Sequence, residues 1–290
     1  MAVGVVAAVL AIVAGSTDDA TVVAAQQAAP AGARASAPVD LTGYWVSIVT
    51  EDWRYRMVMP AKGDYASVPL NPAGRREADS WDPAKDSAAR DSCKAFGAAS
   101  IMRIPGRLHV TWSDDSVLKI ETDAGTQTRL LHFGDGDAPA GPNEWQGYSV
   151  ARWQPAAGRP SAQGTPRDQT GADLGLGRGT DAPSAAGGQQ SPSAGGRGTA
   201  AATAPMRGGS LKVVTTRMRA GYLRKNGVPY SANAVLTEYF DRLDVPGGES
   251  LLVVTTEIVD PEYLATPYWT SPHFKRVDAT GWHPTACTAR

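Results

Sequence analysis

The sequence predicts a mainly β fold, either an antiparallel up-and-down barrel or a β-sandwich, with two short helices and a long disordered insertion. Three observations support this prediction. Apolar and polar residues alternate along residues 106–133, short strand-like runs recur elsewhere, and helix signals gather in one stretch after residue 70. Many short antiparallel strands are typical of a barrel or a sandwich, and closure into a barrel removes exposed sheet edges. We therefore favour the barrel.

Residues 106–133 carry the clearest strand pattern. Leu108, Val110 and Trp112 alternate with polar residues, and two short turns divide the segment into three strands. Further strands are expected in six runs, which read GYWVSIV (43–49), WRYRMVM (53–59), GYSVARW (147–153), SLKVVTTRM (210–218), VLTEYFDRLD (235–244) and LLVVTTEIVD (251–260).

The helical stretch lies between residues 71 and 93. Asn71 is suited to capping a helix, and Pro72 suits the first helical position, where no backbone N–H is needed. Pro83 is expected to divide the stretch into two short helices, because proline disrupts a helix interior.

Changes in composition indicate the domain organisation. The start is apolar and uncharged over residues 1–15, and Val-Ala-Ala follows at 23–25, which is typical of a secretory signal peptide over residues 1–25; an uncleaved anchor is the alternative. A disordered tether is expected at 26–39. Residues 40–290 are then expected to form a single β domain. A disordered insertion rich in Gly, Ala, Ser and Pro interrupts it at 155–209, because this segment has too little apolar area to fold. The protein is predicted to be periplasmic or extracellular, with no integral membrane span after signal cleavage.

The chain has two cysteines, Cys93 and Cys287. In an exported protein such a pair can oxidise, and the bridge would join the helical region to the C-terminal tail. We expect this disulfide; two separate thiols are the alternative. No CxxC or HExxH spacing accompanies the cysteines and the histidines are scattered, so neither a metal site nor a cofactor is predicted.

The chain resembles a group of uncharacterised exported bacterial β-rich proteins in the order of its motifs, which are WDPAKD (81–86) followed by Cys93, GAASIMRIPGRLHVTW (97–112), LKIETDAGTQTRLLHF (118–133), GYSVARW, LKVVTT (211–216), VLTEYFDRL and VDPEYL (259–264). That group has a core motif that reads GRWEGDTLVV, and this chain has a degenerate form, with ARWQPAAG before the insertion and SLKVVTT after it. The resemblance implies that the insertion has grown from a hairpin turn between Trp153 and Leu211. The architecture also looks similar to lipocalin-like barrels, which bind small apolar ligands, but fold alone does not imply function.

Charge and motifs exclude several classes of function. The net charge is −1, with acids and bases mixed along the chain. This argues against nucleic acid and an anionic membrane surface as partners, because both need a concentrated positive face. Ser116 and Lys119 match an S-x-x-K motif by letter only, since they span a turn and a strand, and no catalytic residue is assigned. The oligomeric state stays open.

The leading hypothesis is a non-enzymatic binding module for a small amphipathic molecule or a glycan fragment. Trp and Tyr are numerous, and their flat apolar faces with polar edges suit such ligands. The pocket is expected at one mouth of the barrel, with the long connection 219–233 as a lid. The candidate ligand-binding residues are Arg129, His132, Tyr222, Arg224, Lys225, Tyr230 and Trp269.

Two other functions stay open. A carbohydrate-active hydrolase needs two carboxylates roughly 5 to 9.5 Å apart in one pocket. Glu121, Glu238 and Asp241 are candidates for such a pair. A structural cell-envelope protein would instead have a filled barrel interior and no ligand.

Overall fold

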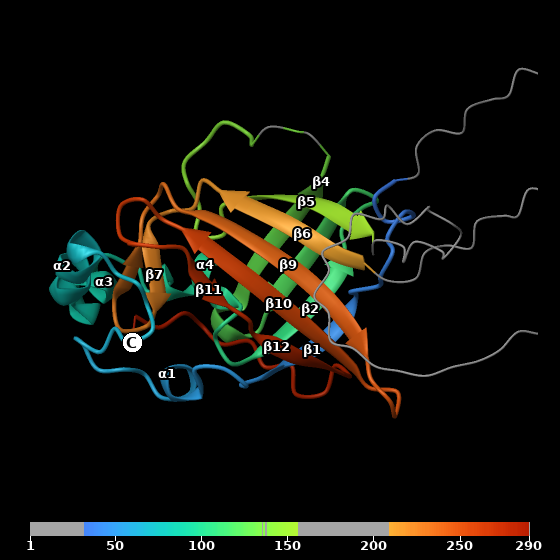
Figure 1. Cartoon of the computed structure of the whole chain (residues 1–290), viewed down its shortest axis with the longest axis horizontal. Coiled ribbons are helices and arrows are strands. Elements are labelled where there is room, and N and C mark those ends of the chain that lie inside the picture. Colours follow the sequence, from blue (N-terminus) through green and yellow to red (C-terminus); the bar gives the residue numbers. More distant parts are fainter. Residues whose placement is uncertain (1–31, 135, 137, 156–208, 290) are drawn as a thin grey trace, which may run out of the picture. The chain divides into compact units, whose positions relative to one another are not determined.

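The computed structural model describes residues 32–134, 136, 138–155 and 209–289. Nine strands of this part of the chain form a barrel, and they are β1 (Gly43–Ile48), β2 (Arg107–Trp112), β3 (Val117–Thr122), β4 (Gln127–Phe133), β5 (Tyr148–Pro155), β6 (Gly209–Thr216), β9 (Val235–Asp244), β10 (Ser250–Val259) and β12 (His273–Val277). Each barrel strand lies next to its successor, β12 pairs with β1, and β9 pairs with β10, so the barrel is closed (Figure 1). The predicted mainly β barrel is confirmed.

The odd number of strands requires one departure from the predicted antiparallel pattern. Nine strands cannot alternate in direction all the way round a closed barrel, so one neighbouring pair must be parallel. That pair is β4–β5, in which Leu131 lies opposite Ser149. The connection between these strands therefore runs from one end of the barrel to the other, as a parallel pair requires.

Strands β5 and β6 form the predicted hairpin, because Trp153 pairs with Leu211. The pairing continues to Pro155 and Gly209, so both ends of the predicted insertion belong to the sheet. Residues 156–208, which make up the rest of that insertion, lie outside the described residues.

The predicted signal peptide (1–25) also lies outside the described residues, as does the first part of the predicted tether. Residues 32–39 were expected to be disordered, but they contact the barrel: the Ala33 carbonyl accepts a hydrogen bond of 2.8 Å from Trp153 Nε1. The described domain therefore begins before residue 40. No helix in the described ranges has the length and apolar character needed to cross a membrane.

Helices occur where they were predicted, and four further short helical elements occur elsewhere. Helices α2 (Pro72–Ser80) and α3 (Pro83–Ala88) confirm the expected pair, and the Asn71 side chain accepts a hydrogen bond from the Gly74 N–H as the N-cap of α2. The other helical elements are α1 (Trp53–Met57), η1 (Lys94–Phe96), α4 (Ala98–Ile101) and η2 (Ala124–Thr126).

The prediction of a strand at 53–59 was wrong. Its aromatic and branched residues fit a strand by composition. The chain instead turns at Asp52, which has a left-handed φ of 47° and whose carbonyl accepts hydrogen bonds from the N–H groups of Tyr55 and Arg56. These bonds wind the next residues into the single turn of α1.

The connections β1–β2, β6–β9 and β10–β12 all lie at the same end of the barrel and cover it, which we call the capped end (Figure 1). The connection expected to be a lid contains β7 (Gly221–Arg224) and β8 (Val228–Tyr230), which pair around the predicted Asn226-Gly227 turn. Asn226 is fully buried and its side-chain amide donates to the carbonyls of Ala61 and Asp64. This segment is therefore a packed part of the cap. The short strand β11 (Tyr268–Thr270) pairs with β10 beside it.

Apolar side chains fill the interior of the barrel. Trp45 is fully buried, and its indole N–H donates to the Leu41 carbonyl at 3.0 Å. Around it pack side chains from every barrel strand, all of them 3 % exposed or less, including Leu108, Val110, Leu118, Ile120, Leu131, Ala151, Leu211, Val213, Phe240, Leu252, Val254 and Phe274. These side chains fill the space between the strands, so a pocket at one mouth of the barrel, as expected, would have to lie at its end.

One ion pair is buried among these apolar side chains. Arg129 on β4 and Glu238 on β9 are both fully buried and make two hydrogen bonds, of 3.0 and 2.5 Å. Thr215 lies beside them, within 3.4 Å of Arg129 Nη2, and Ser149 bonds to Thr215 at 2.7 Å. Removing either member of this pair would leave an unpaired charge in the barrel interior, which is strongly destabilising.

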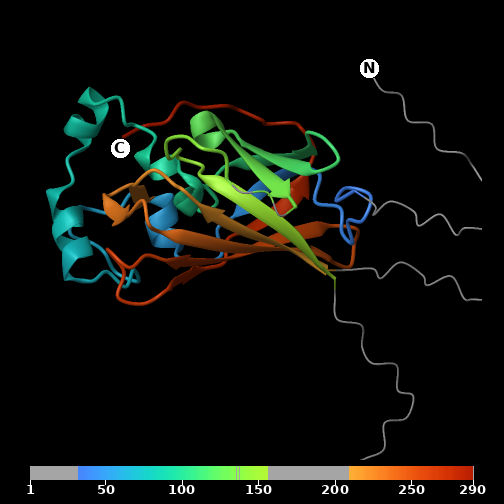
Figure 2. The same ribbon diagram turned by 90° about the horizontal axis from the view of Figure 1, so that it is seen from above.

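The C-terminal tail returns along the outside of the barrel to the capped end (Figure 2). There Cys287 lies at disulfide distance from Cys93, with their Cα atoms 5.0 Å apart, and the predicted pairing meets its geometric requirement. The bridge joins the tail to the start of η1 and closes a loop of 194 residues.

Opening this bridge should destabilise the protein. The chain-entropy relation gives about 5 kcal/mol for a loop of this length. We expect dithiothreitol to lower the urea midpoint of the wild-type protein, and to have no effect on the double variant Cys93→Ser/Cys287→Ser, which should already unfold at the lower midpoint. Identical midpoints for oxidised wild type and double variant would contradict a stabilising bridge.

The buried ion pair predicts a strong asymmetry between single and double substitutions. Arg129→Met or Glu238→Leu alone should each cost about 3–5 kcal/mol of unfolding free energy, because each leaves one unpaired charge in the interior. The double variant should recover most of that loss. Urea unfolding followed by tryptophan fluorescence measures all three, and a double variant no more stable than the singles would show that the pair is not coupled.

Candidate functional site

A pocket of about 460 Å³ lies at the capped end, outside the barrel interior. Three parts of the cap form its walls: α1 with the residues after it, η1 with α4 and the following turn, and β7. Its volume is within the range of roughly 300–1,000 Å³ found for small-molecule sites. The lining residues are Tyr55, Arg56, Met57, Met59, Pro60, Ala95, Ser100, Arg103, Ile104, Pro105, Leu223, Arg224 and Lys225.

Apolar side chains surround the mouth of this pocket. Met57 is 61 % exposed and Met59 is 36 % exposed, although both are large apolar residues. Ile104 is half-buried and Leu223 is buried beneath them. An apolar portion of a ligand could therefore cover side chains that water now contacts, which is favourable at about 25 cal/mol per Å².

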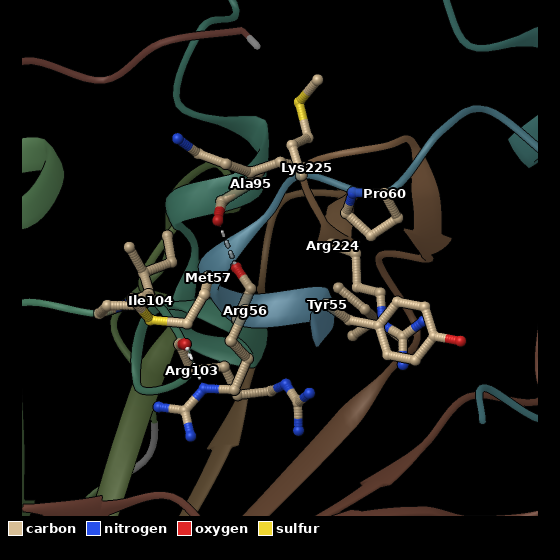
Figure 3. A pocket seen from close by; sticks show the side chains of 13 residues that line it. Tyr55, Arg56, Met57, Pro60, Ala95, Arg103, Ile104, Arg224 and Lys225 are labelled. Atoms are coloured by element: carbon tan, nitrogen blue, oxygen red, sulfur yellow. Dashed lines mark hydrogen bonds between the residues drawn. The ribbon is translucent and has the colours of Figure 1, made fainter. Parts of the chain in front are cut away.

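Cationic side chains form the other part of the lining (Figure 3). Arg103 is buried and pairs with Glu51 at 3.1 Å and with Asp52 at 2.8 Å. Arg224 is also buried, contacts Asp52 at 3.5 Å, and lies over the Tyr55 ring at 4.5 Å from its centroid. The two carboxylates next to the pocket are thus both engaged by these two arginines.

Backbone strain gathers around Arg224. Asp52 and Ser67 are among the few described residues other than glycine that have left-handed φ values, 47° and 63°. Both contact Arg224, and the Ser67 hydroxyl accepts a hydrogen bond of 2.7 Å from its Nη2. Strained residues of this kind persist where the surrounding structure holds them, and they cluster at functional sites.

Arg56 differs from the other two arginines of the pocket. Its Nε donates to the Arg103 carbonyl at 2.8 Å, while Nη1 and Nη2 are enclosed and have no hydrogen-bond partner among the described residues. Burial, and then the neighbouring charge of Arg103, lower the pKa of Arg56. A guanidinium with two enclosed donors and no acceptor is costly and is stabilised by any anion that reaches it.

Lys225 lies on the other side of the pocket from the Arg56 guanidinium (Figure 3). Its ammonium nitrogen lies 4.9 Å from the centroid of the Phe96 ring and contacts the Thr288 hydroxyl at 3.2 Å, next to the bridged Cys287. Burial lowers the pKa of Lys225. The C-terminal tail thus contributes directly to the surroundings of the pocket.

Two of the predicted ligand residues, Arg224 and Lys225, lie in this pocket. Arg129 does not, because it is sealed in the barrel by its pair with Glu238, and that assignment was wrong. Tyr230 is fully buried beneath the cap, where burial raises the pKa of its hydroxyl, so it cannot contact a ligand in the pocket.

The remaining candidates lie elsewhere. Tyr222 is half-buried and its hydroxyl donates to Asp86 at 2.9 Å; burial and then this bond raise the pKa of Tyr222. Trp269 is exposed on β11 and does not line the pocket. His132 stacks on Tyr148, with ring centroids 4.8 Å apart, and lines a second pocket.

The second pocket, of about 360 Å³, lies between the outer face of β4 and the connection to β5. Leu130, Trp145 and Gln146 line it together with His132. Its single carboxylate is that of Glu144. The first pocket has no carboxylate in its lining.

Sequence reasoning missed Arg56 and Arg103. Arg56 was hidden by the wrong assignment of 53–59 as a strand, and Arg103 lies in a turn between α4 and β2 where the quoted motif assigned no role to it. One signal was available: residues 53–59 alternate arginines with large apolar residues, a composition that suits neither a buried strand nor an ordinary surface loop. The described residues contain no cluster of three or more His, Cys, Asp or Glu side chains arranged to hold a metal.

Burial of Lys225 generates a prediction about its titration. The side chain should lose its proton below the ordinary lysine pKa of 10.5, since enclosure disfavours the charged form. Between the lowered pKa of the folded protein and 10.5, the unfolded protein binds more protons at this side chain than the folded protein does. The contribution of Lys225 to the free energy of unfolding therefore increases as pH rises through that window. NMR titration of the lysine Cε and Nζ signals, assigned with Lys225→Arg, measures the midpoint; a value at or above 10.5 would contradict the burial.

No protein-family model, curated protein sequence or solved structure matches this chain. The resemblance to the exported bacterial β-rich group therefore stays a prediction.

Proposed function

We propose that the protein is an exported, non-enzymatic binding module for a small amphipathic molecule, with the pocket at the capped end as its site. The observation that carries this proposal is the mixed lining of that pocket. Exposed Met57 and Met59 stand at its mouth, and buried Arg103 and Arg224 lie in its walls. A few polar groups fixed by ion pairs, set in an apolar surface, are the usual composition of a small-molecule site.

The two alternative functions have less support. A hydrolase with paired carboxylates needs both groups in one concavity. The first pocket has none, and the second has Glu144 alone. A structural envelope protein agrees with the filled barrel interior, but it gives no reason for strained residues and a half-exposed apolar mouth around a pocket of this size.

Binding should be visible at the methionines of the mouth. With full-length protein carrying ¹³C-methyl methionine, at least one compound from a panel of octyl amphiphiles should shift the Met57 and Met59 signals saturably. Met218, which is fully buried in the cap, serves as the internal control and should not move. If no member of the panel shifts Met57 or Met59, the pocket is not an amphiphile site.

Two alanine variants locate the bound compound. Ile104 is already half-buried, so Ile104→Ala should remove ligand contact equivalent to about two methylenes at about 0.8 kcal/mol each, which weakens binding roughly tenfold. Leu130→Ala makes the same kind of change in the second pocket and should leave affinity unchanged. If Leu130→Ala weakened binding and Ile104→Ala did not, the compound would bind in the second pocket, beside His132.

A further inference from the structure

We propose that the ligand of this pocket carries an anionic head group, a carboxylate, phosphate or sulfate, and that the guanidinium of Arg56 binds it. The inference rests on the function proposed above and specifies the class of amphiphile. The apolar mouth would accept a neutral amphiphile or a glycan fragment equally well, and it is the charged wall that favours an anion.

The charge balance of the wall favours an anion. Four cationic side chains line the pocket, those of Arg56, Arg103, Arg224 and Lys225, and no acidic side chain does. The adjacent carboxylates of Glu51 and Asp52 are held by Arg103 and Arg224, and Arg56 forms no ion pair with any described residue. The four cations thus outnumber the two adjacent carboxylates by two positive charges at a partly enclosed site, where an opposite charge is attracted more strongly than in open water.

The hydrogen-bond inventory points the same way. Nη1 and Nη2 of Arg56 and Nε of Arg224 have no acceptor within the described part of the chain. Among the side chains that line the pocket, the enclosed groups without a partner are these nitrogen donors of Arg56 and Arg224, so the complementary group is an acceptor. Oxyanions accept two parallel bonds from a guanidinium, and such charged bonds are about twice as strong as neutral ones.

The position of Arg56 connects the head-group site to the apolar mouth. It lies on α1 directly before Met57, so its chain runs along the pocket wall while its guanidinium points toward Arg103 (Figure 3). The head group reaches Nη1 and Nη2 through a change in the Arg56 side-chain torsions, which opens these enclosed atoms to the pocket. The alkyl portion then lies along Ile104 and Leu223 toward the methionines.

Four octyl compounds with a shared tail test the head group by isothermal titration calorimetry on the full-length protein. Octanoate and octyl phosphate should bind at least about tenfold more tightly than octyl glucoside, because the charged hydrogen bonds are absent from the neutral compound. Octyltrimethylammonium should bind weakest. Acetate and inorganic phosphate show how much affinity comes from the head alone, and the order of octanoate and octyl phosphate tells which oxyanion is preferred.

A matched pair of variants assigns the effect to Arg56. Arg56→Gln should reduce the affinity for both anionic compounds about tenfold or more and leave that for octyl glucoside unchanged, which also shows that the variant pocket is folded. Arg54→Gln removes the same charge from the same helix, but Arg54 is an exposed residue outside the pocket lining, so it should change little. Arg56→Lys, which keeps the charge and loses the bidentate geometry, should fall between them.

Two outcomes overturn the inference without affecting the proposed function: octyl glucoside binding as tightly as the anions, or Arg56→Gln and Arg54→Gln behaving alike. Failure of all four compounds to bind would instead refute the amphiphile site itself.

Discussion

The filled interior of the closed barrel is the constraint on which the rest of this structure depends. Side chains from all nine strands pack around Trp45, and the Arg129–Glu238 pair occupies the space where a ligand would lie in a hollow barrel. The first pocket lies outside this interior and is built from the connections β1–β2 and β6–β9, which meet at the capped end. The arginine cluster of the pocket lies there too.

The cap is held in place by several independent attachments. Asn226 bonds to two carbonyls of the segment after α1, and Gly227 is required because a Cβ at this position would lie 2.2 Å from the Trp81 ring. The Cys93–Cys287 bridge fastens the tail beside η1. These attachments fix the walls formed by η1 and β7, whereas α1 is a single turn with no buried residue. The rigid walls carry Arg103 and Arg224, and the least constrained wall carries Arg56, the residue whose donors lack an acceptor.

How much of this the sequence predicts depends on the range of the interaction involved. Alternation of apolar residues located the barrel strands from Leu108 onward, and Asn71 with Pro83 marked two helices, because these signals are local. The five-residue helix α1 was missed because the turn at Asp52, not composition, decides its conformation. Arg129 was assigned to a ligand because its partner Glu238 is 109 residues away. Arg224 and Lys225 were predicted because they lie in an unusually long connection. That they line one pocket with Arg56 and Arg103 depends on the tertiary fold, which local sequence signals do not show.

The central claim is that an oxyanion binds at the capped end, outside the barrel. A crystal structure of the full-length protein grown with saturating octyl phosphate tests it most directly. The account predicts phosphate oxygens within about 3 Å of Arg56 Nη1 and Nη2, with the alkyl chain along Ile104 and Leu223. Phosphate density beside His132 or within the barrel, with Arg56 still unpartnered, would contradict it.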